Sequence, residues 1–429
     1  MPDLTTQLLP DLKNHKLPGL DLGDQFIYPK YGGQSILNIP ASICEWMSIP
    51  TFGEAPLKSE LLGALGNGVR RVILVLMDGM ALHRFQRWIS EPNGSASVWN
   101  NLIQDGIMAP LTSISPSTTS AALTTLWTGR SPASHGILGY EMWLKEYGVI
   151  TNMIQHAPIS FKGDPGGLRR TGFEPESFLP TPTFGPHLRS HGITPHAFQH
   201  YSIAQSGLSR MFMKDVIIHP FETPADLWIS VRQQIENNLD QRIYAWSYWS
   251  HVDGLSHFHG PDDERPAAEF SQFSTAFERY FLNQLSSAGR KDTLLILTAD
   301  HGQIHTPLDP NYVLKNHPDL NDMLHMQPSG ENRLSYLYIR PGKRDAVRQY
   351  YENTWPGKFV IIDSEKAIQS GLFGPGPAHP NLRARAGDLI VAARDNAYLW
   401  SAEKADFMAG RHGGLHPDEM LVPFLAVRL

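Results

Sequence analysis

The sequence predicts a layered α/β fold built on a mostly parallel central sheet. Three continuous apolar runs, at residues 72–77, 243–249 and 293–298, have the composition of strands buried on both faces. Polar residues follow each run, and stretches with helical periodicity lie between the runs. Strands that alternate with helices are typical of parallel sheets, in which the carboxyl ends of the strands open onto one crevice.

The helices are expected at roughly residues 119–128, 224–239 and 264–287. The last stretch carries phenylalanines at spacings of three and four residues, which places them on one face of a helix: Phe270, Phe273, Phe277 and Phe281.

Three regions are expected along the chain. Residues 1–65 are rich in Pro, Gly and Leu without periodicity, which predicts an arm laid over the main body. The main body comprises residues 66–304 and 386–429. A smaller α+β subdomain, residues 305–385, is inserted between them, with strands at 334–339 and 359–362 and a Gly/Pro-rich link before the chain returns to the main sheet at 388–392.

The bulk composition excludes several classes of protein. The 429-residue chain has a formal net charge of -6, so it lacks the basic field that holds a nucleic acid, and no stoichiometric nucleic-acid partner is expected. Its single cysteine, Cys44, excludes an intrachain disulfide and a cysteine-rich zinc site. The first thirty residues lack the pattern of a secretory signal, and the apolar runs are too short to span a bilayer. These features predict a cytoplasmic protein with no membrane partner, and leave the oligomeric state open.

Six carboxylate and imidazole side chains stand at predicted strand ends or in glycine-containing loops. A sheet that aligns these ends would bring the six together, and a mixed set without thiolates suits zinc, or less well manganese or iron. Glycine directly follows Asp78, His301 and His412 and permits the close backbone approach that a crowded metal site needs. Taken singly, each is as well explained as a loop acid, a helix cap or a surface pair. The candidates are Asp78, Asp253, His257, Asp300, His301 and His412.

A serine- and threonine-rich segment precedes the predicted helix at 119–128. Pro116 ends an extended approach, and Thr119 is expected in the first helical turn, where free N–H groups and the helix dipole favour a phosphate. A threonine hydroxyl becomes a nucleophile when a metal or a base removes its proton. The alternative is that residues 117–120 form only a capping cluster.

Five motifs in order resemble the nucleotide pyrophosphatase/phosphodiesterase (type I phosphodiesterase) branch of the alkaline phosphatase superfamily. The resemblance covers roughly residues 68–140, 190–310 and 385–429. The elements that carry it are LVLMDG, PSTT with TGRSPASHGI, DGLSHFHGP, ADHGQ, and HGGLHPDEMLVP.

The resemblance implies an alkaline phosphatase-like three-layer sandwich with two zinc ions and Thr119 as the nucleophile of a phosphothreonyl intermediate. One zinc would be held by Asp78, Asp300 and His301 and bridged to Thr119. The other would be held by a second set: Asp253, His257 and His412. His135 matches a motif position and is expected to be structural, packing behind the nucleophile helix. The family usually has an asparagine three residues after the nucleophile, where this chain has Ala122.

The substrate stays open among several classes. Cleavage of a phosphodiester or a nucleotide pyrophosphate comes first, because threonine rather than serine resembles that branch. A phosphonate hydrolase similar to phosphonoacetate hydrolase is second. A phosphomonoesterase is third, since it would need a further cation. Arg130, Arg210 and Arg333 are candidates for it, although each is more often a surface or structural ion pair. A phosphomutase is expected to carry serine.

A non-catalytic binder of a phosphorylated ligand is the alternative of a different class, and Ala122 is its only support. Two further histidines, His251 and His305, are expected in packing or at the pocket rim, and among such residues they are the best candidates to support the ligands or contact the substrate.

Overall fold

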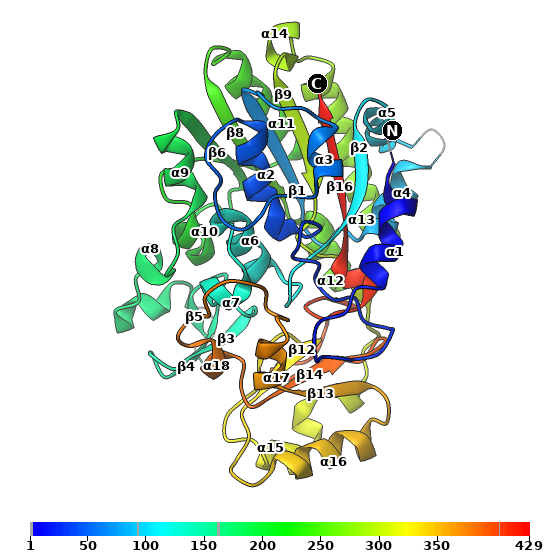
Figure 1. Ribbon diagram of the computed structural model, residues 1–429. Coiled ribbons are helices and arrows are strands. Elements are labelled where there is room, and N and C mark those ends of the chain that lie inside the picture. Colours follow the sequence, from blue (N-terminus) through cyan, green and yellow to red (C-terminus); the bar gives the residue numbers. More distant parts are fainter. Residues whose placement is uncertain (1–2, 92–93, 161–163, 403) are drawn as a thin grey trace.

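The computed structural model describes residues 3–91, 94–160, 164–402 and 404–429, and its main element is a seven-stranded sheet (Figure 1). The strand order is β2-β16-β9-β1-β8-β6-β7. Strands β9, β1, β8, β6 and β7 are parallel, whereas β16 runs antiparallel to its neighbours β9 and β2. The bounds are β1 (Arg71–Met77), β2 (Ile107–Thr112), β6 (Ile193–His200), β7 (Ile217–Phe221), β8 (Arg242–Trp249), β9 (Thr293–Thr298) and β16 (Leu421–Arg428). The mostly parallel α/β fold is thereby confirmed, with the three apolar runs as β1, β8 and β9.

Helices cover both faces of this sheet and complete three layers (Figure 1). One face is covered by α2 (Ile39–Trp46), α6 (Thr119–Thr128), α9 (Phe184–Ser190) and α10 (Gly207–Phe212). The other is covered by α4 (Leu82–Ile89), α5 (Ser97–Asp105), α11 (Pro224–Glu236) and α13 (Glu264–Ala276). The helix predicted at 264–287 is α13, which continues as a π-helical turn over Phe277–Leu282. Its four phenylalanines are fully buried, as their spacing requires.

The first residues of the chain are built into the core. Helix α1 (Thr5–Lys13) packs on β2, and Ser35 bridges to Thr112 of that strand. Leu37 and Trp46 are completely buried. The N-terminal region is therefore more than an arm over the surface, because its apolar side chains fill the layer beside α6.

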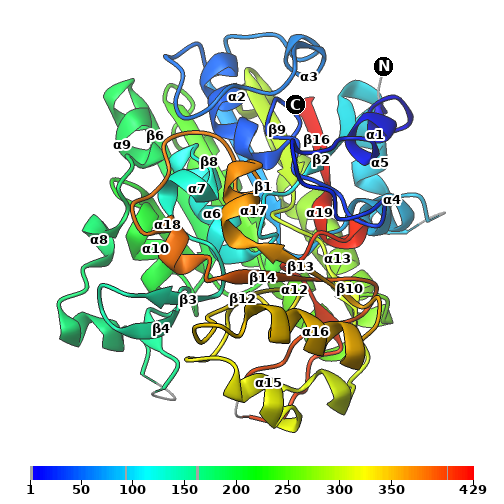
Figure 2. The same cartoon turned by 60° about the horizontal axis from the view of Figure 1, so that its bottom comes forward.

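A second seven-stranded sheet lies beyond the carboxyl ends of the parallel strands (Figures 1 and 2). Its order is β13-β14-β12-β11-β3-β4-β5. The bounds are β3 (Glu141–Leu144), β4 (Val149–Asn152), β5 (Ala157–Pro158), β11 (Ser329–Gly330), β12 (Leu334–Leu337), β13 (Phe359–Asp363) and β14 (Leu389–Ala393). The strands expected near 334–339 and 359–362 are present as β12 and β13.

The expected return to the main sheet at 388–392 is wrong. This segment is β14, which pairs antiparallel with β12 and β13 of the second sheet. All five of its residues are buried, so the run is as apolar as a strand of the main sheet and composition cannot assign it to either sheet. Residues 141–158, expected in the main body, also join the second sheet.

A smaller core fills part of this second lobe under α15 (Pro318–Asp322) and α16 (Arg344–Thr354) (Figure 2). It includes Val347, Tyr351, Leu389 and Leu399. Helices α17 (Ser364–Gln369) and α18 (Leu382–Arg385) instead contribute Ala367 and Leu382 to the main core. Within the described residues, no helix has the length and apolar character needed to cross a membrane.

Candidate active site and metal centre

Most residues of the candidate site follow the carboxyl ends of three parallel strands. Asp78 follows β1 directly, and Asp300 and His301 follow β9. Asp253 and His257 lie on α12 (His251–His259), the helix that follows β8. Gly79 adopts φ +73°, and a Cβ there would lie 3.0 Å from side-chain atoms of Asp253, so glycine lets the ends of β1 and β8 approach each other.

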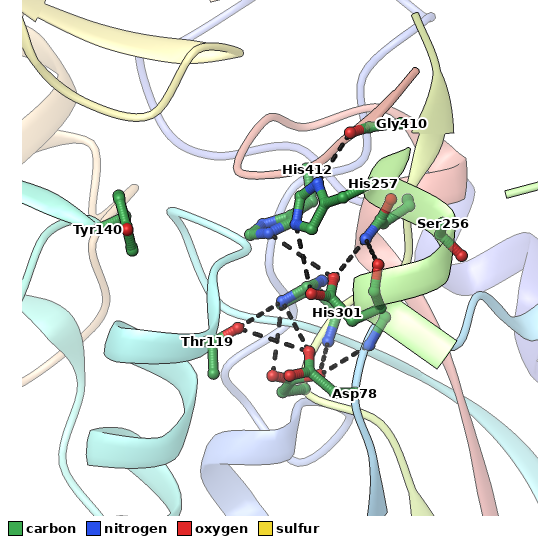
Figure 3. Close-up of polar contacts among 12 residues, drawn as sticks. Asp78, Thr119, Tyr140, Ser256, His257, His301, Gly410 and His412 are labelled. Carbon is green, nitrogen blue, oxygen red and sulfur yellow. Dashed lines mark hydrogen bonds and ion pairs between the residues drawn. The ribbon is translucent and has the colours of Figure 1, made fainter. Parts of the chain in front are cut away.

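Asp78, Asp300 and His301 form the first cluster, with Thr119 beside it (Figure 3). One ligand atom from each of the three lies within 4.8 Å of the others. His301 Nε2 is 3.4 Å from Asp78 Oδ1 and 3.5 Å from Asp300 Oδ2. Thr119 Oγ1 is 3.1 Å from His301 Nε2 and 3.4 Å from Asp78 Oδ1. The threonine hydroxyl therefore faces the same point as the three ligand atoms.

Asp253 lies near both His257 and His412, beside the first cluster, and these three side chains are called the second cluster. Figure 3 shows His257 and His412 on this side of His301. His257 Nε2 is 3.3 Å from Asp253 Oδ2, and His412 Nε2 is 3.9 Å from Asp253 Oδ1. The rings of His301 and His412 stack with centroids 3.8 Å apart, and these two with Asp253 also offer three ligand atoms within 4.8 Å. The seven side chains singled out in the sequence thus converge at one place.

The three imidazoles share one hydrogen-bonding arrangement. In each, Nδ1 lies close to a backbone carbonyl: Gly410 for His257 at 2.8 Å, Gly302 for His301 at 3.0 Å, and Ser117 for His412 at 3.1 Å. Because a carbonyl only accepts, Nδ1 carries the proton and donates it, and a neutral ring then keeps an unprotonated Nε2. All three Nε2 atoms face the acids, which is the orientation of a metal-ligating histidine.

Burial of the acids in the site disfavours their ionised forms. Burial, reinforced by the charges of Asp300 and Asp253, raises the pKa of Asp78 well above its usual range, and burial likewise raises the pKa of Asp300. Burial opposes ionisation of Asp253, but the adjacent His257 and His412 outweigh it and lower that pKa. Asp300 Oδ2 is buried and has no hydrogen-bond partner among the described residues. An orphaned carboxylate oxygen beside imidazole Nε2 atoms that face the acids fits a divalent cation.

Thr119 is the first residue of α6, and Thr118 precedes it with the extended backbone of an N-cap residue. All ten residues of α6 are buried, and Ser120 Oγ donates to the carbonyl of Gly139 at 2.8 Å. Ala122 lies in the hydrophobic core and does not line the cavity, so this chain presents no polar side chain at the position where the family usually has asparagine.

The structure adds side chains that the sequence did not single out. The Tyr248 hydroxyl donates to Asp78 Oδ2, and Gln303 Nε2 donates to Asp253 Oδ1. Gln303 stands two residues after His301, which was a usable signal. Tyr248 was hidden among the apolar residues of a buried strand.

Several of the candidates considered from the sequence do not enter the site. Arg130 pairs with Glu54 at 2.8 Å, and Arg333 pairs with the buried Glu419 at 2.9 Å, so both are structural. His251 packs on Trp249, and neither it, His305 nor Arg210 lines the cavity. His135 is fully buried with Nε2 3.0 Å from Thr125 Oγ1 of α6, in agreement with its expected structural role.

A cavity of about 370 Å³ opens from the two clusters. Thr119, Asp253, His257 and His412 line its inner end. Side chains from β3, from the turn after β11 and from residues 400–408 line the remainder, so the second lobe supplies much of the wall. The arrangement offers a nucleophile, a cation site and room for a substituent beyond the reacting group.

Comparison with known proteins agrees with this geometry. Residues 72–415 match the family described as type I phosphodiesterase / nucleotide pyrophosphatase. No curated protein matches the chain.

Two solved structures show the same fold. Murine ectonucleotide pyrophosphatase/phosphodiesterase 5 is 17% identical with a TM-score of 0.60, over 83% of this chain and 87% of that one. Phosphonoacetate hydrolase from Sinorhizobium meliloti 1021, in complex with phosphonoformate, is 17% identical with a TM-score of 0.61, over 84% of this chain and 90% of that one. The match extends over most of the chain, and the chain therefore belongs to the type I phosphodiesterase/nucleotide pyrophosphatase family of the alkaline phosphatase superfamily.

Proposed function

We propose that the protein is a two-metal phosphoester hydrolase that cleaves phosphodiester or nucleotide pyrophosphate bonds through a phosphothreonyl intermediate. The observation that carries this proposal is the position of the Thr119 hydroxyl, 3.1 Å from His301 Nε2 and beside two adjoining Asp/His clusters. A hydroxyl in a first helical turn that faces buried ligand atoms is suited to attack phosphorus rather than to cap a helix.

Two divalent cations fit these residues. One would be held by Asp78, Asp300 and His301 with Thr119, and the other by Asp253, His257 and His412. Carboxylate and imidazole donors without thiolate suit zinc, with manganese or iron as alternatives. When bound, such cations supply Lewis-acid chemistry that lowers the proton affinity of the threonine hydroxyl and offsets charge on the phosphoryl and leaving oxygens.

The chain's own residues perform the remaining work. Thr119 Oγ1 attacks phosphorus in line and loses its proton, the alcohol or phosphate leaving group departs, and a phosphothreonine remains. Water then attacks the phosphothreonine from the opposite side and frees the product and the threonine. The backbone N–H groups of the first turn of α6 lack intrahelical partners and are placed to hold phosphoryl oxygens.

The test compares Thr119→Ala with Thr119→Ser in zinc- and manganese-loaded protein. Alanine is expected to lower kcat on bis(p-nitrophenyl) phosphate by about 10³-fold or more, while serine, which keeps a hydroxyl, retains far more activity. Bound metal, measured by mass spectrometry, should be nearly unchanged in both variants, because the six Asp and His ligands remain. An alanine variant with most of its activity would reject Thr119 as the nucleophile.

A phosphonate hydrolase is the second candidate, because phosphonoacetate hydrolase shares the fold at a TM-score of 0.61. Parallel rates on a monoester, a diester, a nucleotide pyrophosphate and phosphonoacetate would separate the classes. We expect the diester or the pyrophosphate to be preferred over the monoester, since no unpaired arginine among the described residues lines the cavity.

A further inference from the structure

The wall of the cavity beyond the Asp/His clusters is aromatic and acidic. We call this part the outer cavity. In Figure 3 its residue Tyr140 stands apart from the clusters, on the far side of Thr119. The outer cavity is lined by Tyr140, Glu141, Phe258, Glu331, Trp400 and Phe407, with Lys404 at its rim.

Neither of its carboxylates forms a salt bridge within the described residues. Glu331 accepts hydrogen bonds from the Tyr140 backbone N–H, at 2.6 Å, and from the Thr118 hydroxyl. Both donors are neutral, and no salt bridge to Glu141 or Glu331 occurs in the part of the chain that is described. Burial raises the pKa of Glu331 to about 8 and also raises the pKa of Glu141. The two groups are therefore partly buried acids without a salt bridge, and Lys404 is the cation whose charge acts on Glu141.

Three aromatic residues of the outer cavity, Tyr140, Phe258 and Phe407, are exposed to solvent, whereas Trp400 is buried. Phe258 is 62% exposed and Phe407 is 40% exposed, and their ring centroids lie 5.4 Å apart. Trp400 stands 6.2 Å from Phe407. Large apolar side chains left exposed around a cavity indicate a surface that a ligand covers.

An ammonium group from the chain itself already rests on these rings. Lys404 Nζ lies 4.7 Å from the Phe407 ring centroid and 5.8 Å from that of Trp400. The wall thus offers cation–π contacts at the distances that favour them. Lys404 is exposed, so its long side chain can swing into water at little cost.

The remaining cation of the cavity is not free to hold an anion. Arg411 is buried, pairs with Asp406, and stacks on Tyr398 with its guanidinium 3.6 Å from the ring centroid. Glu141, Glu331 and the rim lysine Lys404 are therefore the groups that set the charge of the outer cavity, and a bound cation would favour ionisation of both acids. A second phosphate or a carboxylate would meet the acids there.

We propose that the outer cavity binds an ammonium group carried by the substrate, so that the preferred substrate is a phosphodiester of an alcohol that bears a quaternary or primary ammonium. This inference rests on the proposed function. The phosphate lies at the clusters, the ammonium displaces Lys404 from the aromatic rings, and Glu141 and Glu331 supply the countercharge.

Binding tests the inference without turnover. Choline and its uncharged isostere 3,3-dimethyl-1-butanol are titrated into metal-loaded protein by calorimetry. We expect choline to bind at least about tenfold more tightly, and Glu141→Gln and Glu331→Gln each to reduce that preference several-fold, since each removes one countercharge. Lys404→Gln is the opposite control: it should strengthen choline binding, because a competing cation is lost. Equal binding of the two probes, or weaker choline binding in Lys404→Gln, would overturn the inference.

Turnover separates this inference from the proposed function. The ratio of kcat/KM for p-nitrophenyl phosphorylcholine to that for bis(p-nitrophenyl) phosphate should exceed about ten and fall severalfold in Glu141→Gln. Turnover of bis(p-nitrophenyl) phosphate without a preference for the cationic ester overturns the inference alone. If neither ester is cleaved, the proposed function fails, and the choline titration still decides what the outer cavity binds.

Discussion

The buried pair of Arg333 and Glu419 ties the second lobe to the loop that carries His412. Both side chains are fully buried, with Arg333 Nε and a terminal nitrogen 3.1 and 2.9 Å from the two Glu419 oxygens. The same carboxylate accepts from the Gly414 N–H at 2.9 Å and the His416 N–H at 3.2 Å. Glu419→Gln removes the countercharge of the buried Arg333 guanidinium. It also places the new side-chain NH₂ group, which is a donor, among N–H groups that need an acceptor.

The cost follows from this geometry. Breaking a buried ion pair from one side costs about 3–5 kcal/mol, because the other charge stays uncompensated. At about 2.1 cal/mol/K per residue, the 429 residues give an unfolding entropy of about 0.9 kcal/mol/K. We therefore expect the Glu419→Gln variant to melt about 3–6 °C lower.

The assay is differential scanning calorimetry of chelator-treated protein, so that metal binding does not mask the change. Glu176→Gln is the matched control, because Glu176 also lies 2.9 Å from an arginine but its pair with Arg169 is exposed. The control substitution should lower the free energy of unfolding by about 1 kcal/mol or less. In Arg333→Met combined with Glu419→Met, stability should recover only in part, since the Gly414 and His416 N–H groups lose their acceptor. A Glu419→Gln midpoint that falls no further than that of the control would refute this account.

Three further changes test other parts of the site. Tyr248→Phe removes the hydroxyl that donates to Asp78, so zinc affinity should fall about tenfold. The affinity is measured by competition with a chromophoric chelator. An unchanged affinity would show that this donor does not orient the ligand. Gly413→Ala forces φ +104° on an L-residue and places its Cβ 2.4 Å from side-chain atoms of Glu331. The melting temperature and the metal content of this variant should therefore both fall. A variant that melts and binds metal like the parent would contradict the close approach of Gly413 and Glu331. His135 is fully buried with its pKa lowered to about 3 by burial. The unfolded chain takes up this proton below about pH 6.5 and the folded chain does not, so the residue should cost about 2 kcal/mol of stability between pH 6.5 and pH 5; urea titrations at several pH values should give a flatter profile for His135→Gln, and an identical profile would refute the assignment.

Much of the local structure follows from side-chain pattern alone. The continuous apolar runs identified β1, β8 and β9 nearly to the residue, because a strand covered on both faces has no polar alternation to obscure it. Helix α6 was likewise expected at its observed bounds, 119–128, and the structure ends it at Gly129, which adopts φ +60°.

The sequence did not show which of the two sheets each strand joins. The strand β14 was assigned to the main sheet and lies in the second one. The composition of a strand indicates that it is buried and extended. It does not indicate which strand is its hydrogen-bonded neighbour, because that depends on which sheet edge the complete fold leaves unpaired.

The order of motifs along the chain, with polar residues after each buried strand, determined which seven side chains gather, because parallel strands align their carboxyl ends in any such sheet. Only the tertiary structure decided how those side chains are held and what they face. Backbone carbonyls at Gly302, Gly410 and Ser117 orient the three imidazoles, and Glu141 meets Glu331 in a cavity built from segments far apart in sequence. Contacts of this kind depend on the global packing of two lobes, which no local period of side chains encodes.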